Sequence, residues 1–462
     1  MINSSSFFID LSYFIAAALF IYGLRRMSSP ISARTGIWIA GAGMLLAIAA
    51  SFAHPNVSSN HWLILLAILI GGTMSFIHAK RVELAEMPQM IALYNGLGGG
   101  AAATIAAVEL LRAAEHGASE RILGVVGALI GCIAFSGSLL AFAKLSGWVK
   151  FGARFGNRQT AYVAIMASVL LLGFLLAFSN TAHPVLLLMF FILSLLFGFV
   201  MTLPIAAADM PVLISLYNAG AGLAVGFEGY VLGNPAMMVA GTLVCAAGVL
   251  LTRLMAQAVN RRLSEILYSG FGIAHETTEA TTQYGHVNEV DAFDAAVTMA
   301  FAEEVLIVPG YGMAVAQAQH KVQELTQLLE ERGVNVQFAI HPVAGRMPGH
   351  MNVLLAEAGV AYEKIRDLSD INSEMSKIDV ALVIGANDIV NLSARSDAKS
   401  PLQGMPILNV DESKSVIVLK RIDGKGYTGI DNPLLQHSKT RVHYGDAKES
   451  VQHIISAVKS LD

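Results

Sequence analysis

The chain has 462 residues, of which 55% are hydrophobic and 14% are charged, and its mean hydropathy is +0.58. A composition this apolar lies outside the range of soluble proteins, so we expect most of the chain to sit in lipid. The formal net charge of -4 and the lack of a basic run exclude a nucleic-acid-binding protein.

Nine apolar segments are long enough to cross a bilayer, whose hydrocarbon core of about 30 Å requires about 20 residues of helix. The first is expected to be a retained helix, because residues 1–20 lack the basic region and the cleavage site of a signal peptide. Both cysteines, Cys132 and Cys245, lie in such segments, so no disulfide or metal site is predicted. The predicted transmembrane helices span residues 7–24, 36–53, 62–78, 88–111, 122–143, 160–179, 184–203, 211–230 and 236–252.

Basic residues concentrate in every second loop, and this bias predicts the orientation because lysine and arginine resist translocation. The loops on the other side contain only two basic residues, Arg112 and Arg121. The N-terminus is therefore expected outside, and everything after residue 253 is expected in the cytoplasm. The basic residues that indicate the cytoplasmic side are Arg25, Arg26, Arg34, Lys80, Arg81, Lys144, Lys150, Arg154, Arg158, Arg253, Arg261 and Arg262.

A ten-residue stretch that starts at Glu86 recurs at Asp209, with the acid, Met-Pro, Leu-Tyr and a final asparagine at identical spacing. Each copy is typical of a helix start, because proline is tolerated in the first turn and the acid complements the helix dipole. Both helices are expected to begin on the cytoplasmic side. Two parallel copies indicate two related units about an axis along the membrane normal.

The asparagines that end the two copies, Asn95 and Asn218, lie about 10 Å into their helices and therefore within the lipid core. One interpretation is that these amides bridge neighbouring helices while the glycines that follow permit close packing. The other is a polar pathway for an ion or a proton, because repeated intramembrane polar groups tend to face a conduit. Glu109 and Glu228 lie nearer to helix ends, where we expect them to be solvated at the membrane surface.

After the last apolar segment the composition becomes polar and charged. We predict a membrane domain at residues 1–262, a linker at residues 263–300 and a second domain at residues 301–462. The last domain shows strands interleaved with helices, which indicates an α/β doubly wound, Rossmann-like parallel sheet. Its predicted strands are residues 304–309, 335–341, 380–384, 407–410 and 416–419, and its predicted helices are residues 313–332 and 447–460.

The first of these strands leads directly into Gly310-Tyr311-Gly312-Met313-Ala314-Val315, which opens a helix. In a dinucleotide-binding turn the first glycine permits a tight turn and the second lets backbone N–H groups approach a pyrophosphate. The helix N-terminus adds a favourable dipole. The third glycine of that motif is replaced here by Val315.

An NAD site usually has Asp or Glu at the end of the second strand, but here that strand ends in His341-Pro342, so NADP is the better match. Lys420 and Arg421, which end a later strand, are candidates for binding its 2′-phosphate. A solvated edge strand would also carry such a pair. Residues 345–349 and 385–388 follow strands on the usual ligand side, and they are also compatible with ordinary turns.

Four stretches together resemble one family, the beta subunit of the proton-translocating nicotinamide nucleotide transhydrogenase. They are residues 308–314, residues 341–350, Gly385-Ala386-Asn387-Asp388 and Lys420-Arg421, and the resemblance covers essentially the whole chain. It implies that hydride passes from NADH on a separate alpha subunit to NADP⁺ bound at residues 301–462 of this chain. This transfer would be coupled to inward proton movement through the membrane helices. It also implies a dimer of alpha-beta units in the bacterial inner membrane. NADP(H) would bind to its Rossmann-like domain in the reversed orientation.

The resemblance further implies roles for single residues. Asn387 and Asp388 would be catalytic, with Asp388 near the nicotinamide as a sensor of occlusion, and Asn95, Asn218 and Asp209 would belong to the proton path. Some members have a proton-relay histidine where this sequence has Asn95, so that role does not transfer. The residues expected to contact NADP(H) are Gly310, Tyr311, Gly312, Val343, Ala344, Gly345, Arg346, Met347, Pro348, Gly385, Ala386, Asn387, Asp388, Ile389, Lys420, Arg421, Gly426, Tyr427, Asp431, Asn432, Pro433, Asp446 and Ala447.

The main alternative is an ion channel or transporter gated by a cytoplasmic nucleotide-binding domain, because such a protein would also join membrane helices to a Gly-x-Gly strand. A potassium channel would contain Thr-Val-Gly-Tyr-Gly before an inner helix, and this sequence does not. A membrane scaffold with a degenerate fold is a third interpretation, for which Lys420, Arg421 and the glycine turns would be accidental.

Overall fold

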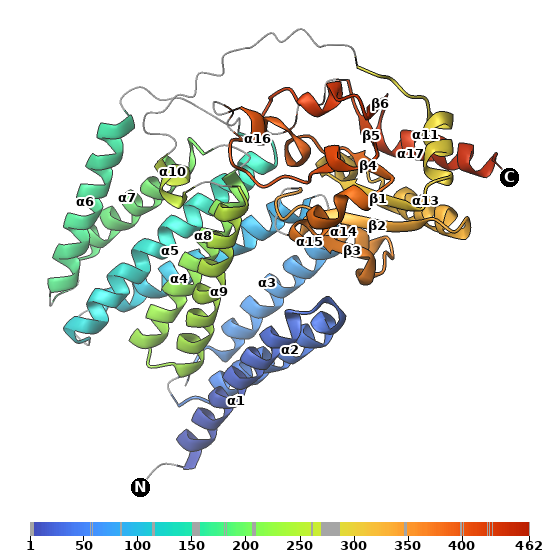
Figure 1. Ribbon diagram of the computed structural model, residues 1–462. Coiled ribbons are helices and arrows are strands. Elements are labelled where there is room, and N and C mark those ends of the chain that lie inside the picture. The colour runs from blue at the N-terminus through green and yellow to red at the C-terminus, as the bar shows by residue number, and fades with distance from the viewer. Residues whose placement is uncertain are drawn as a thin grey trace. The chain divides into compact units, whose positions relative to one another are not determined.

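The computed structural model describes residues 4–55, 57, 59–83, 86–112, 116–149, 158–179, 181, 183–205, 209–259, 262–268, 287–345, 349–397, 400, 402–422, 424, 426 and 428–461 (Figure 1). The chain divides into two compact units. The first, Met1–Ala206 with Val212–Thr252, is called the membrane unit below. The second, Ala207–Pro211 with Arg253–Asp462, is called the sheet unit.

Nine described helices are long and apolar enough to cross a membrane, as the sequence predicts. Prolines begin several of them because a proline has no N–H to leave unpaired in the first turn and its fixed φ suits a helix. The helices are α1 (Ser4–Met27), α2 (Pro30–Phe52), α3 (His61–Arg81), α4 (Met87–Leu111), α5 (Ala118–Leu145), α6 (Arg158–Phe178), α7 (Pro184–Thr202), α8 (Met210–Val231) and α9 (Pro235–Ala258).

Within the membrane unit, glycines bring helix backbones into direct contact. A Cβ placed on Gly131 of α5 would lie 2.7 Å from the carbonyl oxygen of Gly99 in α4. A Cβ placed on Gly222 of α8 would lie 2.7 Å from the backbone nitrogen of Cys245 in α9. The glycine-rich stretch after each copy of the repeat therefore packs its helix on the next one, as small residues do in membrane bundles.

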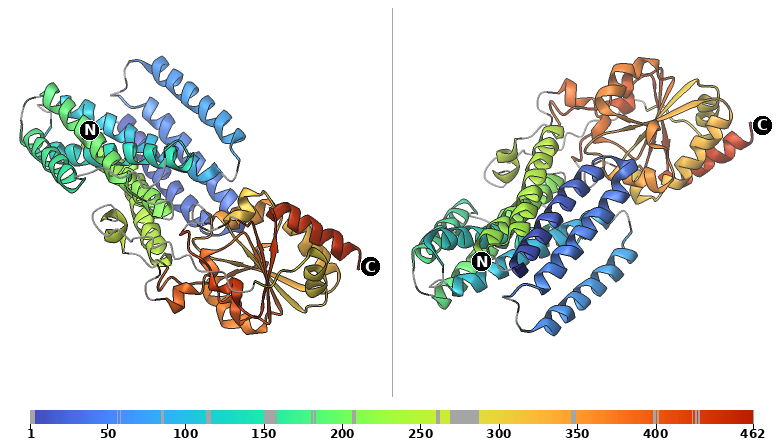
Figure 2. Two further views of the ribbon diagram at one scale, coloured as in Figure 1. Left: turned by 90° about the horizontal axis from the view of Figure 1, so that it is seen from above. Right: turned by 90° about the horizontal axis from the view of Figure 1, so that it is seen from below.

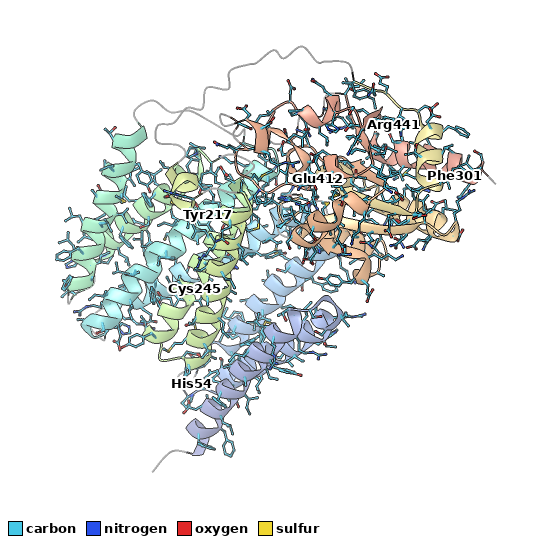
Figure 3. All side chains as sticks on the ribbon, viewed as in Figure 1. His54, Tyr217, Cys245, Phe301, Glu412 and Arg441 are labelled. Atoms are coloured by element: carbon cyan, nitrogen blue, oxygen red, sulfur yellow. The ribbon has the colours of Figure 1, made fainter. Side chains whose placement is uncertain are left out.

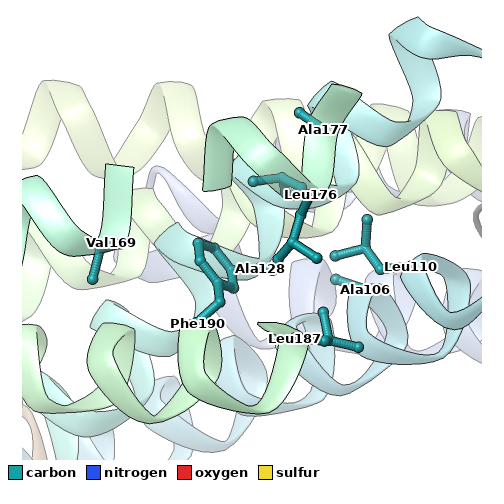
Figure 4. Close-up of a cluster of buried hydrophobic side chains, with 9 residues drawn as sticks. Ala106, Leu110, Ala128, Val169, Leu176, Ala177, Leu187 and Phe190 are labelled. Atoms are coloured by element: carbon teal, nitrogen blue, oxygen red, sulfur yellow. The ribbon is translucent and has the colours of Figure 1, made fainter. Parts of the chain in front are cut away.

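Apolar side chains complete the packing of the membrane unit. Phe190 of α7 is fully buried in a cluster that joins α4, α5, α6 and α7 (Figure 4). Ala236 of α9 joins a smaller cluster with Ile9, Tyr13 and Ala50 of α1 and α2. Helix α3 differs from the rest, because it buries none of its residues within this chain. The members of the larger cluster are Ala106, Leu110, Val125, Ala128, Val169, Leu176, Ala177, Leu187 and Phe190.

The sheet unit contains one parallel six-stranded sheet in the order β3-β2-β1-β4-β5-β6, with helices on both faces (Figure 2). The strands are β1 (Glu304–Pro309), β2 (Asn335–Ile340), β3 (Ile365–Asp367), β4 (Val380–Ile384), β5 (Ser415–Lys420) and β6 (Thr440–Tyr444). The apolar run of β4 is completely buried, because a central parallel strand is covered on both faces. The order reverses between β1 and β4, which confirms the predicted doubly wound fold.

Short helices connect and cover these strands. Helices α11 and α13 both pack against α17, which buries an apolar face that includes Val451, Ile454 and Val458. Asp446 caps α17 by accepting a hydrogen bond from Lys448 N at 2.9 Å. The helices are α10 (Leu263–Tyr268), α11 (Ala292–Ala300), α12 (Tyr311–Val315), α13 (Gln319–Glu331), α14 (His350–Glu357), α15 (Leu368–Glu374), α16 (Ser393–Ser396) and α17 (Ala447–Lys459).

The prediction of a strand at residues 407–410 is wrong. Ile407 and Leu408 are buried as expected of an apolar run, but their backbone bonds do not join the sheet. The carbonyl oxygen of Ile407 accepts from Asn372 Nδ2 at 2.8 Å, and Leu408 N donates to the carbonyl oxygen of Ile389 at 2.9 Å. An asparagine side chain and a loop thus supply the partners that a neighbouring strand would have supplied.

Other local predictions also need correction. The single helix predicted at residues 313–332 is two helices, α12 and α13, because Gln317 between them adopts a left-handed φ of 49°. The short β3 and the edge strand β6 were not predicted, since β6 contains mostly polar residues around the buried Val442. Within the stretch predicted as a linker, α11 packs on α17, and Val290 N donates to the carbonyl oxygen of Val442 at 3.0 Å.

Candidate functional site

Two glycine turns pack against each other where the carboxyl ends of β1 and β4 meet. Gly310 N donates to the carbonyl oxygen of Ile384, and Gly312 N donates to that of Gly385, both at 2.9 Å. A Cβ on Gly385, whose φ is 61°, would lie 2.5 Å from the Cα of Gly312. The glycines therefore allow close contact between turns. Because both N–H groups are already bonded within the protein, the structure does not support their expected approach to a pyrophosphate.

Tyr311 follows the first turn and is half-buried at the start of α12, which has only five residues. Met313 and Ala314 of that helix are buried. The helix is shorter than predicted, and its dipole is correspondingly weaker than that of the long helix that the sequence suggested.

The turn after β4 holds a second loop above it through Asn387 and Asp388. Asp388 Oδ1 accepts from Thr428 Oγ1 at 2.9 Å, and Asp388 Oδ2 accepts from Thr428 N at 3.2 Å. Asn387 Nδ2 donates to the carbonyl oxygen of Ile430, and Asn432 Nδ2 donates to that of Asn387. The structure thus brings together two stretches, residues 385–389 and 426–433, that the sequence analysis assigned to one site.

Within this pair of stretches, Ala386 is half-buried and Ile389 is buried, and Asp431 is tied to the turn by a bond from Asn391 Nδ2 to its carbonyl oxygen at 3.3 Å. Gly426 and Pro433 are exposed. A Cβ on Gly426 would lie 2.6 Å from Asp388 Oδ1, so the loop passes directly over the carboxylate.

The turn after β2 is fixed by a buried histidine. His341 Nε2 donates to the carbonyl oxygen of Pro406 at 2.7 Å, and its Nδ1 accepts from Val343 N at 3.2 Å. Burial lowers the pKa of His341 to about 4, so the ring is neutral with its proton on Nε2. This ring positions the half-buried Val343 and the buried Ala344 and Gly345. Arg346, Met347 and Pro348, and likewise Tyr427, lie outside the described residues.

The cation pair lies at the end of β5, next to the last strand. Lys420 pairs in register with Tyr444, and its carbonyl oxygen accepts from Gly445 N at 3.1 Å. Arg421 is exposed, whereas Lys420 is half-buried. Asp446 and the buried Ala447 follow at the start of α17, so these four predicted residues share one corner of the sheet.

All of these turns lie at one edge, because the carboxyl ends of parallel strands point the same way. Neighbouring strands are about 4.8 Å apart, so the turns after β1, β4, β5 and β6 extend over about 15 Å. The edge offers backbone groups, amides, one carboxylate held by Thr428 and a cation pair. Such a set binds and orients an extended anionic ligand, and hydride transfer between nicotinamides needs orientation more than proton chemistry.

In the membrane unit the two asparagines of the repeat have different surroundings. Asn95 is half-buried and its Nδ2 lies 3.3 Å from Ser138 Oγ of α5 and 3.5 Å from the carbonyl oxygen of Ile214 in α8. Asn218 is exposed on this chain. Asp209, just before α8, is buried. The structure therefore gives Asn95 the bridging contacts of the first interpretation, and its contact on α8 lies one helical turn before Asn218.

The acids near the ends of the repeated helices were misjudged from the sequence. Glu228 of α8 is fully buried, and Glu109 of α4 is bonded to His116, whose Nε2 lies 2.9 Å from Glu109 Oε2. Solvation at the membrane surface is therefore the wrong account of Glu228. Only the tertiary packing of α8 reveals its burial, although the recurrence of an acid near the end of both repeated helices was a signal in the sequence.

Comparison with known proteins gives consistent matches over nearly the whole chain. The family model of the NAD(P) transhydrogenase beta subunit matches residues 9–457. Two proteins from Rhodospirillum rubrum, each named NAD(P) transhydrogenase subunit beta, are 41% identical to this chain over 462 residues. These alignments cover 97% of this chain and 98% of each relative, so they include both the membrane unit and the sheet unit.

Proposed function

Because the chain belongs to the NAD(P) transhydrogenase beta subunit family, we propose that it binds NADP(H) on the sheet unit and couples hydride transfer from NADH to inward proton translocation. The family makes the chain the beta subunit of an oxidoreductase that acts with an alpha subunit. In this proposal the alpha subunit holds NAD(H), and the product is NADPH. The observation that carries the proposal is the Lys420-Arg421 pair at the carboxyl edge of a doubly wound sheet.

The residues at this edge fit NADP(H) in charge and in topology. The strand order reverses between β1 and β4, and dinucleotides bind at such switch points. The strand β2 ends at Ile340 and is followed by His341 rather than by an acid that would repel a 2′-phosphate. Lys420 and Arg421 would supply the charge-assisted hydrogen bonds that select a phosphorylated nucleotide.

When bound, NADP⁺ supplies the nicotinamide ring that accepts a hydride, and the protein's residues bind and orient it. The turns at Gly310 and Gly385 form the rigid base of the site. Asp388, bonded to Thr428 on the loop above, holds that loop closed and thereby excludes water. Opening of this loop would break both Thr428 contacts, which makes Asp388 a sensor of occlusion, while Asn387 fixes the neighbouring loop carbonyl of Ile430.

The apolar helices make the chain a multi-pass membrane protein. We place it in the bacterial inner membrane with the N-terminus outside and the sheet unit in the cytoplasm, which the asymmetry of basic residues supports. The proton path includes Asn95, Asn218 and Asp209, and the complex is a dimer of alpha-beta units.

The nucleotide assignment is tested with Lys420→Ala combined with Arg421→Ala in the full-length chain. We expect NADPH binding, measured by calorimetry, to weaken at least about tenfold, because each charge-assisted contact contributes about 1.5–3 kcal/mol. Binding of NADH should change little. Lys377→Ala is the matched control, since Lys377 is 73% exposed and precedes β4 at the opposite edge of the sheet. Unchanged NADPH affinity in the double variant would refute the assignment.

The activity is tested after purification with the alpha subunit and reconstitution into liposomes. We expect NADH-dependent reduction of NADP⁺ and simultaneous proton movement across the membrane. A channel gated by nucleotides would conduct ions without hydride transfer, so ion flux in the absence of any NADPH formation would favour that alternative.

A further inference from the structure

Glu228 of α8 is a buried acid for which the proton path described above has no role. Its side chain is 0% exposed, and among the described residues neither carboxylate oxygen has a hydrogen-bond partner. A Cβ on Gly127 of α5 would lie 2.5 Å from Glu228 Oε1. The carboxyl group therefore occupies the space that the missing side chain of Gly127 leaves between α5 and α8.

An ionised carboxylate in this position is strongly unfavourable, because both oxygens are buried and no described residue donates a hydrogen bond to replace their hydration. The arrangement therefore favours the protonated acid. Ionisable residues inside a membrane are rare, and their usual reason is the passage of an ion or a proton. A packing role does not account for Glu228, since a neutral side chain of similar size would fill the same space without this cost.

A second group of titratable side chains lies at the junction of α4 and α5. His116 Nε2 lies 2.9 Å from Glu109 Oε2, and His116 Nδ1 lies 3.2 Å from Glu120 Oε2. The side chains of His116 and Glu109 are 15% and 11% exposed, so this histidine is enclosed between two carboxylates. Both ring nitrogens of His116 thus face a carboxylate oxygen.

The junction and Glu228 are neighbours in the bundle. Gly124, one turn before Gly127 on α5, faces both helices: a Cβ there would lie 3.7 Å from Leu110 Cδ2 of α4 and 4.0 Å from Val231 Cγ2 of α8. Glu109 precedes Leu110, and Glu228 lies one turn before Val231. Both acids therefore lie within one helical turn of residues that face Gly124.

The other charged groups at this end have their own contacts. The side chain of Arg112 is exposed, and its NH1 lies 3.8 Å from Glu109 Oε1. The buried Arg121 donates hydrogen bonds to the carbonyl oxygens of Ala177 and His116. Glu120 Oε2 accepts from Gly117 N at 2.8 Å. Helix α9 contributes apolar residues here, because a Cβ on Gly229 would meet Met237 and Met238.

We propose that His116, Glu109 and Glu228 form a proton-binding site at the carboxyl ends of the two repeated helices, through which protons enter the path. Glu228 is the deep member that carries the proton in its neutral form. His116 and Glu109 are the outer members, which exchange protons with water. In the proposed orientation this end faces the outside, and the inference rests on the proposed function because it needs proton translocation to act on.

The test uses the complete complex with the alpha subunit in liposomes and compares Glu228→Gln and Glu228→Asp with the unchanged chain. Gln fills the same space but cannot carry a proton, so proton uptake and coupled NADP⁺ reduction should fall at least about tenfold, while Asp should restore part of both. NADPH binding should change less than about twofold, since the variant leaves the sheet unit intact. An infrared band from a protonated carboxylic acid should disappear in Glu228→Gln.

His116→Gln is the second variant, because it lies at a helix junction where substitution disturbs packing less. Nucleotides added to the medium reach only those complexes whose nucleotide site faces the outside of the liposome. In these complexes the proposed proton-binding site faces the lumen, so the pH of the lumen is the pH at this site. Removing one titrating group should shift the dependence of proton uptake on lumen pH by about one unit. His61→Asn, an exposed histidine at the start of α3, is the matched control and should leave this dependence unchanged.

The outcomes distinguish failure of the proton-binding site from failure of the proposed function. Normal proton uptake by Glu228→Gln, or an unchanged lumen-pH profile in His116→Gln, would overturn this inference and leave the proposed function intact. Failure of the unchanged complex to move protons during NADP⁺ reduction would overturn the proposed function and this inference with it.

Discussion

Two buried ionisable side chains, His341 of the sheet unit and Glu228 of the membrane unit, have opposite surroundings. In the sheet unit, both ring nitrogens of His341 are bonded, to the carbonyl oxygen of Pro406 and to Val343 N. In the membrane unit, the two carboxylate oxygens of Glu228 have no hydrogen-bond partner among the described residues. The same holds for Asn95 Oδ1. The first arrangement stabilises a turn. The second leaves groups that gain partners only from water, protons or another subunit.

The repeated helices show that this contrast depends on tertiary position. Tyr94 and Tyr217, the latter labelled on α8 in Figure 3, occupy the same place in the repeat. Tyr217 is buried, whereas Tyr94 is half-buried. Asn95 reaches Ser138, whereas Asn218 is exposed. The shared pattern of the repeat gives the same helix start in both copies, and the neighbouring helices then decide which copy packs inward.

The largest expected effect separates the two asparagines. Asn218→Leu should abolish proton uptake by the reconstituted complex, because the exposed amide is free to contact water or the partner subunit in the proposed path. It should leave the thermal stability of the chain nearly unchanged. Asn95→Leu should instead lower that stability by about 1 kcal/mol, since it breaks the contact with Ser138.

Both quantities are measured on the same preparations, by proton uptake in liposomes and by thermal unfolding in detergent. The comparison fails if Asn218→Leu pumps normally, or if the two variants lose stability equally.

The next effect concerns His341 and pH. Its pKa is about 4 in the folded chain against an ordinary value of 6.5, so between these values the unfolded chain binds a proton that the folded chain does not. The stability of residues 287–462 should therefore be complete above pH 6.5 and fall as the pH falls toward 4. The contribution is at most about 3 kcal/mol, from 1.36 kcal/mol for each unit of pKa.

Urea unfolding of this domain at a series of pH values measures the effect. His341→Gln keeps a donor for the carbonyl oxygen of Pro406 but cannot titrate, so its stability should vary less between pH 6.5 and 4. His453→Gln, on an exposed position of α17, controls for the loss of one histidine. A pH profile of His341→Gln that matches the unchanged domain would show that burial of this ring has no role in acid unfolding.

Much of the fold follows from patterns of the sequence that reflect local physics. The length of apolar runs predicted each membrane helix to within six residues at either end, because lipid thickness sets that length. The strands β1, β4 and β5 were predicted because buried parallel strands are continuous apolar runs. The edge strand β6 and the buried loop at residues 407–410 were not, since their pairing depends on distant partners.

The candidate site shows the same division. The turns at Gly310, Gly385 and Lys420 could be placed from strand ends alone. The bonds of Asp388 to Thr428 and of His341 to Pro406 join residues far apart in the chain, so no spacing predicts them. Glu228 was misjudged for a related reason, because its distance from the helix end suggests solvation while its neighbours on α5 determine its burial.

The smallest expected effect compares the two tyrosines of the repeat. Thr202 Oγ1 donates to the carbonyl oxygen of Gly198 at 2.8 Å, so the hydroxyl of Tyr217, at 2.5 Å, must donate to Thr202 Oγ1. Tyr217→Phe removes this buried bond and should lower the free energy of unfolding by about 1 kcal/mol. Tyr94→Phe loses only long contacts, at 3.3 Å to His78 and 3.5 Å to Ser75, and should cost less than about 0.5 kcal/mol. Thermal unfolding of the full-length chain in detergent measures both, and equal losses would mean that the buried hydroxyl contributes no more than the half-buried one.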